Sequence, residues 1–145
     1  WWRYALVVAW MFVIFRFSGE VGDTSGGRSA AIVRWLQSLG VPGTFDLLSL
    51  IVRKAAHATV YAVLAVLSFH ALQADFTRRG ALAGAWGISA LYAISDETHQ
   101  LFVAERSGSW RDVLIDVGGA LLGLVLASRI SRRRERAAGA VPGAV

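Results

Sequence analysis

The chain of 145 residues is long enough for a single domain; 55% of its residues are hydrophobic and 17% are charged. A typical soluble domain carries about 25% charged residues, so the composition argues against a water-soluble globule and for a protein of the lipid bilayer. A net charge of +5 would suggest nucleic acid in a soluble protein, but here the basic residues gather at the ends of apolar segments and in the tail. We therefore expect membrane lipids as partners and no nucleic acid. The absence of cysteine excludes thiol catalysis and thiolate metal sites.

Residues 1–17 predict the first membrane-spanning helix. They read WWRYALVVAWMFVIFRF, an uncharged apolar core between Arg3 and Arg16, which can snorkel to the membrane surface. A signal peptide is the rival interpretation, but Arg16 closes the apolar stretch and no A-x-A cleavage site follows, which favours a retained helix. Because the chain opens on tryptophan rather than methionine, we expect a trimmed start and a longer first segment.

A long connection, residues 18–54, comes next. Apolar residues at i, i+3, i+4 and i+7 predict a short helix on the membrane surface: Ile32, Trp35, Leu36 and Leu39. The VPGT stretch at 41–44 breaks this pattern, and Thr44 can cap a new helix that begins at Phe45. Since the apolar run 45–52 is too short to cross a bilayer, we expect an interfacial or re-entrant segment that leads into the second span.

Three further apolar stretches predict the remaining spans: residues 55–74, 80–95 and 113–130. The expected fold is an all-α integral membrane protein, a four-transmembrane-helix bundle with the interfacial or re-entrant helical segment between helices 1 and 2. We expect one membrane domain over residues 1–131 and a basic, disordered tail over 132–145. The arginines of that tail predict a multi-pass protein with both termini in the cytoplasm.

Threaded in this way, polar side chains from three helices reach the outer membrane face. They are Lys54 and His57 on the second helix, Asp96, Glu97, His99 and Gln100 on the third, Arg106 and Arg111 on the loop, and Asp112 and Asp116 on the fourth. Each falls within about two helical turns of one face. Unrelated residues would scatter over both faces, so the pattern predicts a polar cleft between helices that opens outward.

The fourth helix carries its two acids on the same stripe as Gly119 and Gly123. These glycines form a small-xxx-small pair that lets a neighbouring helix approach closely. An acid facing lipid would cost several kcal/mol, so we expect Asp116 to face protein, with Arg106 or Arg111 as its nearest partner.

Each of these residues also has a purely structural interpretation. Asp116 would then be a helix-packing carboxylate, Asp112 the N-cap of the fourth helix, His57 an interfacial hydrogen-bonding group and Lys54 a snorkelling side chain. His70 lies near the inner end of its helix without charged neighbours, and we expect it to be structural.

Histidine beside carboxylates can act as general acid and base or bind a divalent cation, and nearby cations suit a phosphate or pyrophosphate on a lipid headgroup. The candidate catalytic residues are His57 as base, Asp96 and Glu97 as acid, base or ligand, and Asp112 as orienter. The candidate substrate-binding residues are Lys54, Gln100, Arg106 and Asp116. No G-x-S-x-G, H-E-x-x-H or P-loop motif occurs, and the D-E-T-H spacing permits a divalent metal without requiring one.

Three stretches resemble the VanZ-like family of small bacterial membrane proteins: RKAAHATVYAVL (53–64), SDETHQLFVAERSGSWRD (95–112) and DVLIDVGGALLG (112–123). FRFSGE (15–20), which ends the first helix, is similar to the family's pattern as well. The resemblance implies a helical protein of the bacterial inner membrane with a shared polar set, here Lys54, His57, Asp96, Glu97, Gln100, Arg106 and Asp112. Relatives often carry Asn at position 116, which leaves the role of Asp116 open between catalysis and hydrogen bonding.

The family is named for low-level resistance to teicoplanin, a lipid-tailed glycopeptide antibiotic that acts on cell-wall precursors outside the membrane. Two functions stay open. One is a hydrolase or transferase acting on a lipid-linked or lipid-tailed cell-envelope substrate. The other is a non-catalytic binding or accessory protein for a lipid headgroup, a lipoglycopeptide or a cell-wall synthesis partner.

Overall fold

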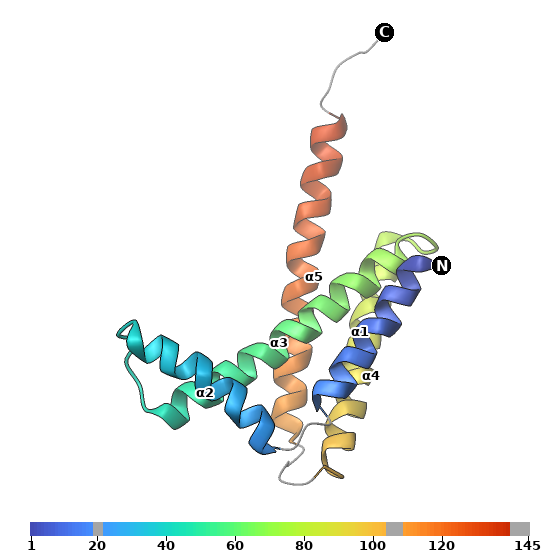
Figure 1. The fold of residues 1–145 in the computed structure, drawn as a ribbon. Helices are drawn as coiled ribbons and strands as arrows, with labels where there is room; N and C mark the ends of the chain where they lie inside the picture. The colour runs from blue at the N-terminus through green and yellow to red at the C-terminus, as the bar shows by residue number, and fades with distance from the viewer. Residues whose placement is uncertain (19–21, 104–108, 140–145) are drawn as a thin grey trace.

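The computed structural model describes residues 1–18, 22–103 and 109–139, with side chains described throughout except at 22–26, 28 and 134–139. Across these ranges the chain forms five α-helices and no strand: α1 (Trp2–Ser18), α2 (Gly22–Ser38), α3 (Phe45–Leu72), α4 (Arg78–Gln100) and α5 (Trp110–Gly139). The all-α prediction is therefore confirmed. In Figure 1, α1, α3, α4 and α5 pack together, while α2 and the first half of α3 project to one side as an arm.

The crossing of α3 and α5 lies at the centre of the structure and is close enough for backbones to touch. A Cβ added to Gly119 would lie 2.2 Å from the carbonyl oxygen of Ala58, and one added to Gly123 would lie 2.7 Å from that of Ala62. Small residues thus face small residues at a four-residue spacing on both helices. The predicted close approach is confirmed, and it sets the separation between the two helices that line the site below.

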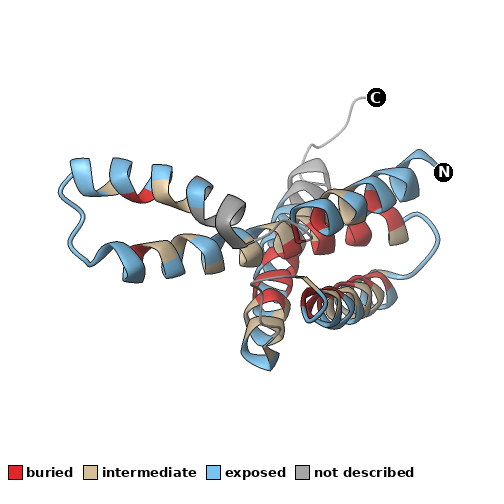
Figure 2. Ribbon diagram, turned by 60° about the horizontal axis from the view of Figure 1, so that its bottom comes forward, coloured by how far each residue is buried: buried red, intermediate tan, exposed pale blue. Residues whose placement is uncertain are grey.

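The core forms where the four packed helices meet (Figure 2). Its largest fully buried apolar side chains, Tyr61, Leu64 and Phe69, all come from α3, and alanines of α4 fill the space opposite them. The Tyr92 hydroxyl donates to the carbonyl oxygen of Met11 at 2.6 Å, which ties α4 to α1. Because both elements of the arm leave this core, the arm is buried only along the seam between α2 and α3.

A glycine ends α2. Gly40 has a φ of 81°, and the N–H groups of Gly40 and Val41 donate to the carbonyl oxygens of Gln37 and Leu36 at 3.0 and 3.1 Å. This is the Schellman arrangement, which satisfies carbonyl groups that the last helical turn leaves without a partner. The break predicted after the surface helix therefore has a left-handed glycine as its cause.

Thr44 starts α3, as predicted, because its side chain accepts a hydrogen bond from the N–H of Leu47 at 3.3 Å. Residues 45–52, where we expected an interfacial or re-entrant segment leading into the second span, form one continuous 28-residue helix with that span. In Figure 1 this first half of α3 projects from the packed helices together with α2. Neither glycine nor proline occurs between Phe45 and Leu72, so nothing in the sequence interrupts the helix there.

The other helices also differ from their predicted bounds. α2 begins well before the predicted surface helix at 32–39, and α4 runs on beyond residue 95 to Gln100. Residues 132–139 continue α5, where we expected a disordered tail from 132 onward, because arginine, glutamate and alanine are strong helix formers. The rest of the predicted tail, 140–145, lies outside the described residues.

Within the described part of the chain, two helices are long and apolar enough to cross a membrane, Phe45–Leu72 and Trp110–Arg133. α1 and α4, the other two predicted spans, do not meet the same combination of length and hydropathy. The fold therefore supports two of the four expected spans directly.

Candidate functional site

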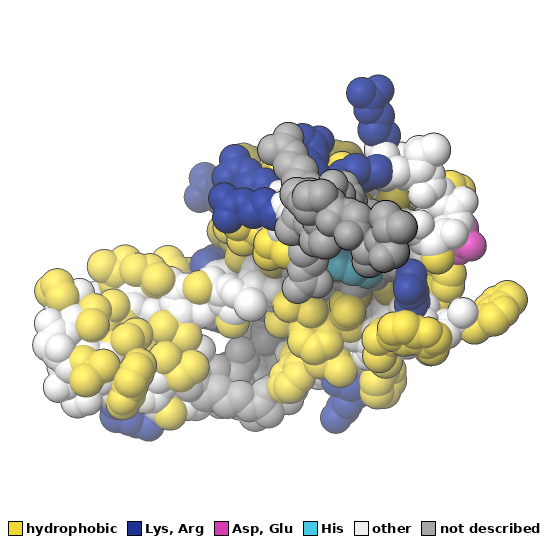
Figure 3. Space-filling model, turned by 90° about the horizontal axis from the view of Figure 1, so that it is seen from above, with side chains coloured by type: hydrophobic (Ala, Val, Ile, Leu, Met, Phe, Trp, Pro, Cys, Tyr) yellow, Lys and Arg dark blue, Asp and Glu magenta, His cyan; other side chains and the backbone are white. Residues whose placement is uncertain are grey.

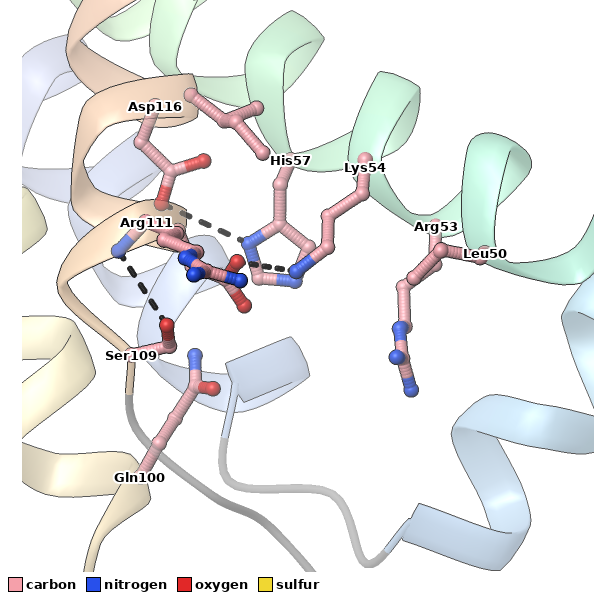
Figure 4. A pocket seen from close by; sticks show the side chains of 10 residues that line it. Leu50, Arg53, Lys54, His57, Gln100, Ser109, Arg111 and Asp116 are labelled. Carbon is pink, nitrogen blue, oxygen red and sulfur yellow. Dashed lines mark hydrogen bonds and ion pairs between the residues drawn. The ribbon is translucent and has the colours of Figure 1, made fainter. Parts of the chain in front are cut away.

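A cavity of about 410 Å³ opens between the first half of α3, the end of α4 and the start of α5. Its lining consists of Leu50, Arg53, Lys54, His57, Gln100, Ser109, Arg111, Asp112, Ile115 and Asp116. Figure 4 shows the side chains converging on this space from three helices. Five of the eight predicted site residues line it together, although they come from segments far apart in the sequence.

His57 and Asp116 face each other across the α3–α5 seam. The His57 Nδ1 lies 3.8 Å from the Asp116 Oδ2, which is ion-pair range but longer than a hydrogen bond. Asp116 is fully buried, and neither of its carboxylate oxygens has a hydrogen-bond partner among the described residues. The other ring nitrogen of His57 points away from Asp116 into the cavity (Figure 4). In this pair, protein encloses the Asp116 carboxylate, while the second ring nitrogen of His57 is open to the cavity.

Lys54 and Asp112 form a second ion pair at the cavity wall, with about a quarter of each side chain exposed. Asp112 had the alternative prediction of an N-cap for the last helix. That cap is formed by Ser109, whose hydroxyl accepts from the N–H of Arg111 at 3.3 Å. Asp112 is consequently available to neutralise Lys54, while the carboxylate beside His57 is Asp116 rather than the expected Asp112.

A buried hydrogen-bond network lies behind the cavity and joins α1 to α4. The Ser18 hydroxyl donates to the Asp96 Oδ2 at 2.7 Å, and the Gln100 Nε2 donates to the Ser18 Oγ at 2.7 Å and to the Asp96 Oδ2 at 3.2 Å. All three side chains are buried, and the Asp96 Oδ1 has no partner among the described residues. Gln100 lines the cavity, whereas Asp96 does not line it and acts only as a hydrogen-bond acceptor for the Gln100 amide.

Glu97 lies one position further along α4 and joins the end of that helix to the start of α5. Its Oε2 accepts a hydrogen bond from the backbone N–H of Ser109 at 2.7 Å, while its Oε1 has no partner in the described part of the chain. Glu97 is buried and does not line the cavity. Its contact fixes the residue that caps α5.

Two members of the predicted polar layer are not part of this arrangement. The His99 ring packs against the ring of Phe15 with centroids 4.6 Å apart and does not line the cavity. Arg106, predicted to bind substrate, lies outside the described residues. Within the ranges that the structure describes, no three His, Asp or Glu side chains form a group that could hold a metal ion.

Several residues of the site were absent from the predicted set. Arg53 could have been found, because it lies four residues before His57 and therefore shares its helix face. Arg111 was considered only as a partner for Asp116, yet it lines the cavity itself. Ser18 could not have been found from spacing, since its contacts depend on how α1 packs against α4.

The mouth of the cavity carries a net positive charge. Asp112 neutralises Lys54, whereas Arg53 and Arg111 line the cavity without a carboxylate partner among the described residues. The Arg111 guanidinium lies 5.8 Å from the centroid of the Trp110 ring, a cation–π contact that does not cancel its charge. The cavity therefore presents an imidazole beside two exposed guanidinium groups.

A family model described as VanZ/LLP1 matches residues 3–131 of the chain. No curated protein and no solved structure shows significant similarity to it.

Proposed function

The chain belongs to the VanZ/LLP1 family, and on that premise we propose a membrane-embedded hydrolase or transferase that acts on a lipid-linked or lipid-tailed cell-envelope substrate. The observation that carries the proposal is the pair of His57 and Asp116, 3.8 Å apart at the wall of a cavity edged by arginines. Family membership and the two apolar helices indicate a membrane protein. Buried ionisable groups in such a protein are costly, and they mark sites of function.

His57 is the proposed general base. Asp116 would hold the proton of the imidazole on Nδ1, which leaves the other ring nitrogen as the acceptor that faces the cavity. That nitrogen would take a proton from water, or from an acceptor hydroxyl, as its oxygen attacks the substrate. The same proton would then pass from His57 to the leaving oxygen, so the histidine ends as it began.

The remaining cavity residues have supporting roles in this proposal. The ion pair of Lys54 and Asp112 would fix the side of the cavity along α3 and α5. Gln100, held by Ser18 and Asp96, would present its amide to the substrate from α4. A site of this kind needs no bound metal for the proton transfer described, although a divalent cation brought by a phosphorylated substrate is compatible with it.

We further propose that α1, α3, α4 and α5 all cross the bacterial inner membrane, with both termini in the cytoplasm. Large apolar side chains of α1 and α4 point away from the core: Val8 is 65% exposed, Phe12 63% and Leu91 71%. Figure 3 looks onto the end from which α5 projects and shows basic side chains gathered there. They are arginines, because the one lysine of the chain, Lys54, lines the cavity. The positive-inside rule would place that end in the cytoplasm and the cavity outside.

Single cysteines test this topology, because the 145 residues contain none. Phe102→Cys, at the cavity end, is expected to react with a membrane-impermeant maleimide in intact cells, and Arg132→Cys only after lysis. Labelling of Arg132→Cys in intact cells, with Phe102→Cys protected, would reverse the proposed orientation.

The activity is tested by comparing the two histidines of α3. Purified protein would be incubated with dioctanoyl phosphatidic acid and with farnesyl pyrophosphate, and released phosphate measured; in parallel, teicoplanin susceptibility would be measured in bacteria that express each variant. His57→Asn is expected to abolish phosphate release and any resistance, whereas His70→Asn retains both. Equal activity of the wild type and His57→Asn in both assays would refute the proposed catalysis.

The alternative is a binding or accessory protein that holds a lipid headgroup, a lipoglycopeptide or a wall-synthesis partner in the same cavity. The distance of 3.8 Å between His57 and Asp116 favours this alternative, because an acid that orients a general base normally lies within hydrogen-bond distance of it. Resistance that depends on the cavity cations but survives His57→Asn would support binding without turnover.

A further inference from the structure

An apolar stripe on α3 leads directly into the cavity. Leu47, Leu50 and Ile51 are 51%, 44% and 52% exposed, and they lie on the side of the helix that continues, at spacings of three and four residues, to Lys54 and His57. Leu48, which points to another side, is buried, and α2 packs against this part of α3. At a rise of about 1.5 Å per residue, the bare apolar stripe extends about 6 Å along the helix from Leu47 to Ile51, and the His57 imidazole lies about 9 Å further along.

Leu50 joins the apolar stripe to the cavity, since it is exposed on the stripe and also lines the cavity. The cavity adds Ile115 from α5 on the opposite wall. Beyond these apolar residues come Arg53 and Arg111, the two cations of the cavity that no carboxylate neutralises in the described part of the chain. The apolar stripe of α3 is thus followed directly by the two unneutralised arginines of the cavity.

We propose that the stripe and these arginines bind a lipid phosphate: an acyl or prenyl tail on Leu47, Leu50 and Ile51, and the phosphate between Arg53 and Arg111. Guanidinium groups bind phosphate through paired N–H donors, which suits two arginines on facing helices. The phosphate would then lie next to His57, so the inference rests on the proposed function and gives it a substrate class. The tails of any bilayer lipid would also contact the stripe, but a neutral lipid carries no anionic group that the two arginines could bind.

Thermal unfolding of the full chain in dodecyl maltoside, followed by tryptophan fluorescence, tests the proposal. Three probes separate the parts of the ligand: dioctanoyl phosphatidic acid has tail and phosphate, dioctanoylglycerol has the tail alone, and inorganic phosphate has the anion alone. Binding to the native state raises the unfolding temperature in a saturable way. We expect a saturable rise with phosphatidic acid at concentrations where neither of the other probes produces one.

Variants then assign the contacts. Arg53→Gln and Arg111→Gln are each expected to weaken the apparent Kd for phosphatidic acid by about tenfold or more, the loss of one charge-assisted contact. Ile51→Ser is expected to weaken it by about threefold to tenfold through lost apolar contact. Arg34→Gln on α2 and Leu91→Ser on α4 are the matched controls, since both residues are exposed and neither lines the cavity.

Equal rises with phosphatidic acid and dioctanoylglycerol, or equal Kd values for the wild type and both arginine variants, would overturn the proposal. A rise with inorganic phosphate alone would replace the lipid by a free anion and overturn it equally. His57→Asn separates the lipid site from the proposed catalysis: if it binds phosphatidic acid like the wild type and the wild type shows no turnover, the lipid site stands and the catalysis fails. Turnover of phosphatidic acid with a KM that is unchanged in the arginine variants would instead support the catalysis and overturn the lipid site.

Discussion

The two ends of the helix bundle use the same residue types in different ways. At the end from which α5 projects, the Tyr4 hydroxyl donates to Asp75 at 2.5 Å, and the His70 Nδ1 lies 2.8 Å from the carbonyl oxygen of Val66. Both of these contacts are exposed. At the cavity end three carboxylates, Asp96, Glu97 and Asp116, are buried, and oxygens of Asp96 and Asp116 have no partner among the described residues.

The contrast teaches which polar groups stabilise the fold and which do not. The exposed His70 ring bonds to a carbonyl oxygen of its own helix, the local contact expected of a structural histidine. His57 lies on the same helix beside a buried acid that lacks hydrogen bonds, an arrangement that lowers stability unless a ligand or a reaction uses it. Stability therefore does not account for the unpaired oxygens of Asp116 at the cavity end, and the proposed function would account for them.

The largest expected effect comes from Asp116→Asn. Removing the charge that stabilises the His57 imidazolium is expected to lower turnover about 100-fold or more. The same change removes a buried charge without hydrogen bonds, so we expect the free energy of unfolding to rise by about 1–3 kcal/mol. Phosphate release and thermal unfolding measure the two quantities. Asp75→Asn, at the other end, is the control and should alter neither by much; loss of stability in Asp116→Asn would show that the acid is structural.

The next effect concerns stability alone and is expected at the α3–α5 seam, on which both ends depend. Gly119→Ala places a methyl group against the backbone of Ala58, so we expect a loss of about 3 kcal/mol in the free energy of unfolding. Gly118→Ala is the matched control: nothing lies within 4 Å of the added Cβ, and the helix itself gains up to about 1 kcal/mol. Similar stability of the two variants in thermal unfolding would contradict the close α3–α5 crossing.

Ser18→Ala ranks next. It leaves Asp96 and the Gln100 amide buried with fewer partners, which is expected to cost about 1–3 kcal/mol of unfolding free energy. Because Gln100 lines the cavity, we also expect KM to rise while kcat changes less. Unchanged stability and kinetics would mean that α1 does not help to hold the site.

Tyr4→Phe completes the series with the smallest change. Its hydroxyl bonds to Asp75 in an exposed position, so we expect a loss of about 0.5 kcal/mol and no change in turnover. A larger loss than that of Ser18→Ala, measured by the same thermal unfolding, would contradict the claim that the exposed contacts at this end contribute less stability than the buried ones at the cavity end.

The sequence predicted the helical class and five of the ten residues that line the cavity, because both leave periodic signals. Lys54 and His57 repeat at helical spacing, and Gly119 and Gly123 mark the seam that brings them to Asp116. Two features could not be predicted. The length of α3 was missed because Arg53 and Lys54 look like the end of a span, although they do not stop a helix. The pairing of carboxylates was missed because which acid meets which base depends on the α3–α5 crossing, and spacing along one helix does not determine it.

A double-mutant cycle between His57 and Asp116 tests the central claim most directly, with teicoplanin susceptibility and phosphate release as readouts. If the two side chains act as one unit, His57→Asn, Asp116→Asn and the double variant should be impaired to nearly the same degree. Independent effects that multiply in the double variant would show that the residues do not work together, which would contradict the proposed base formed by His57 with Asp116.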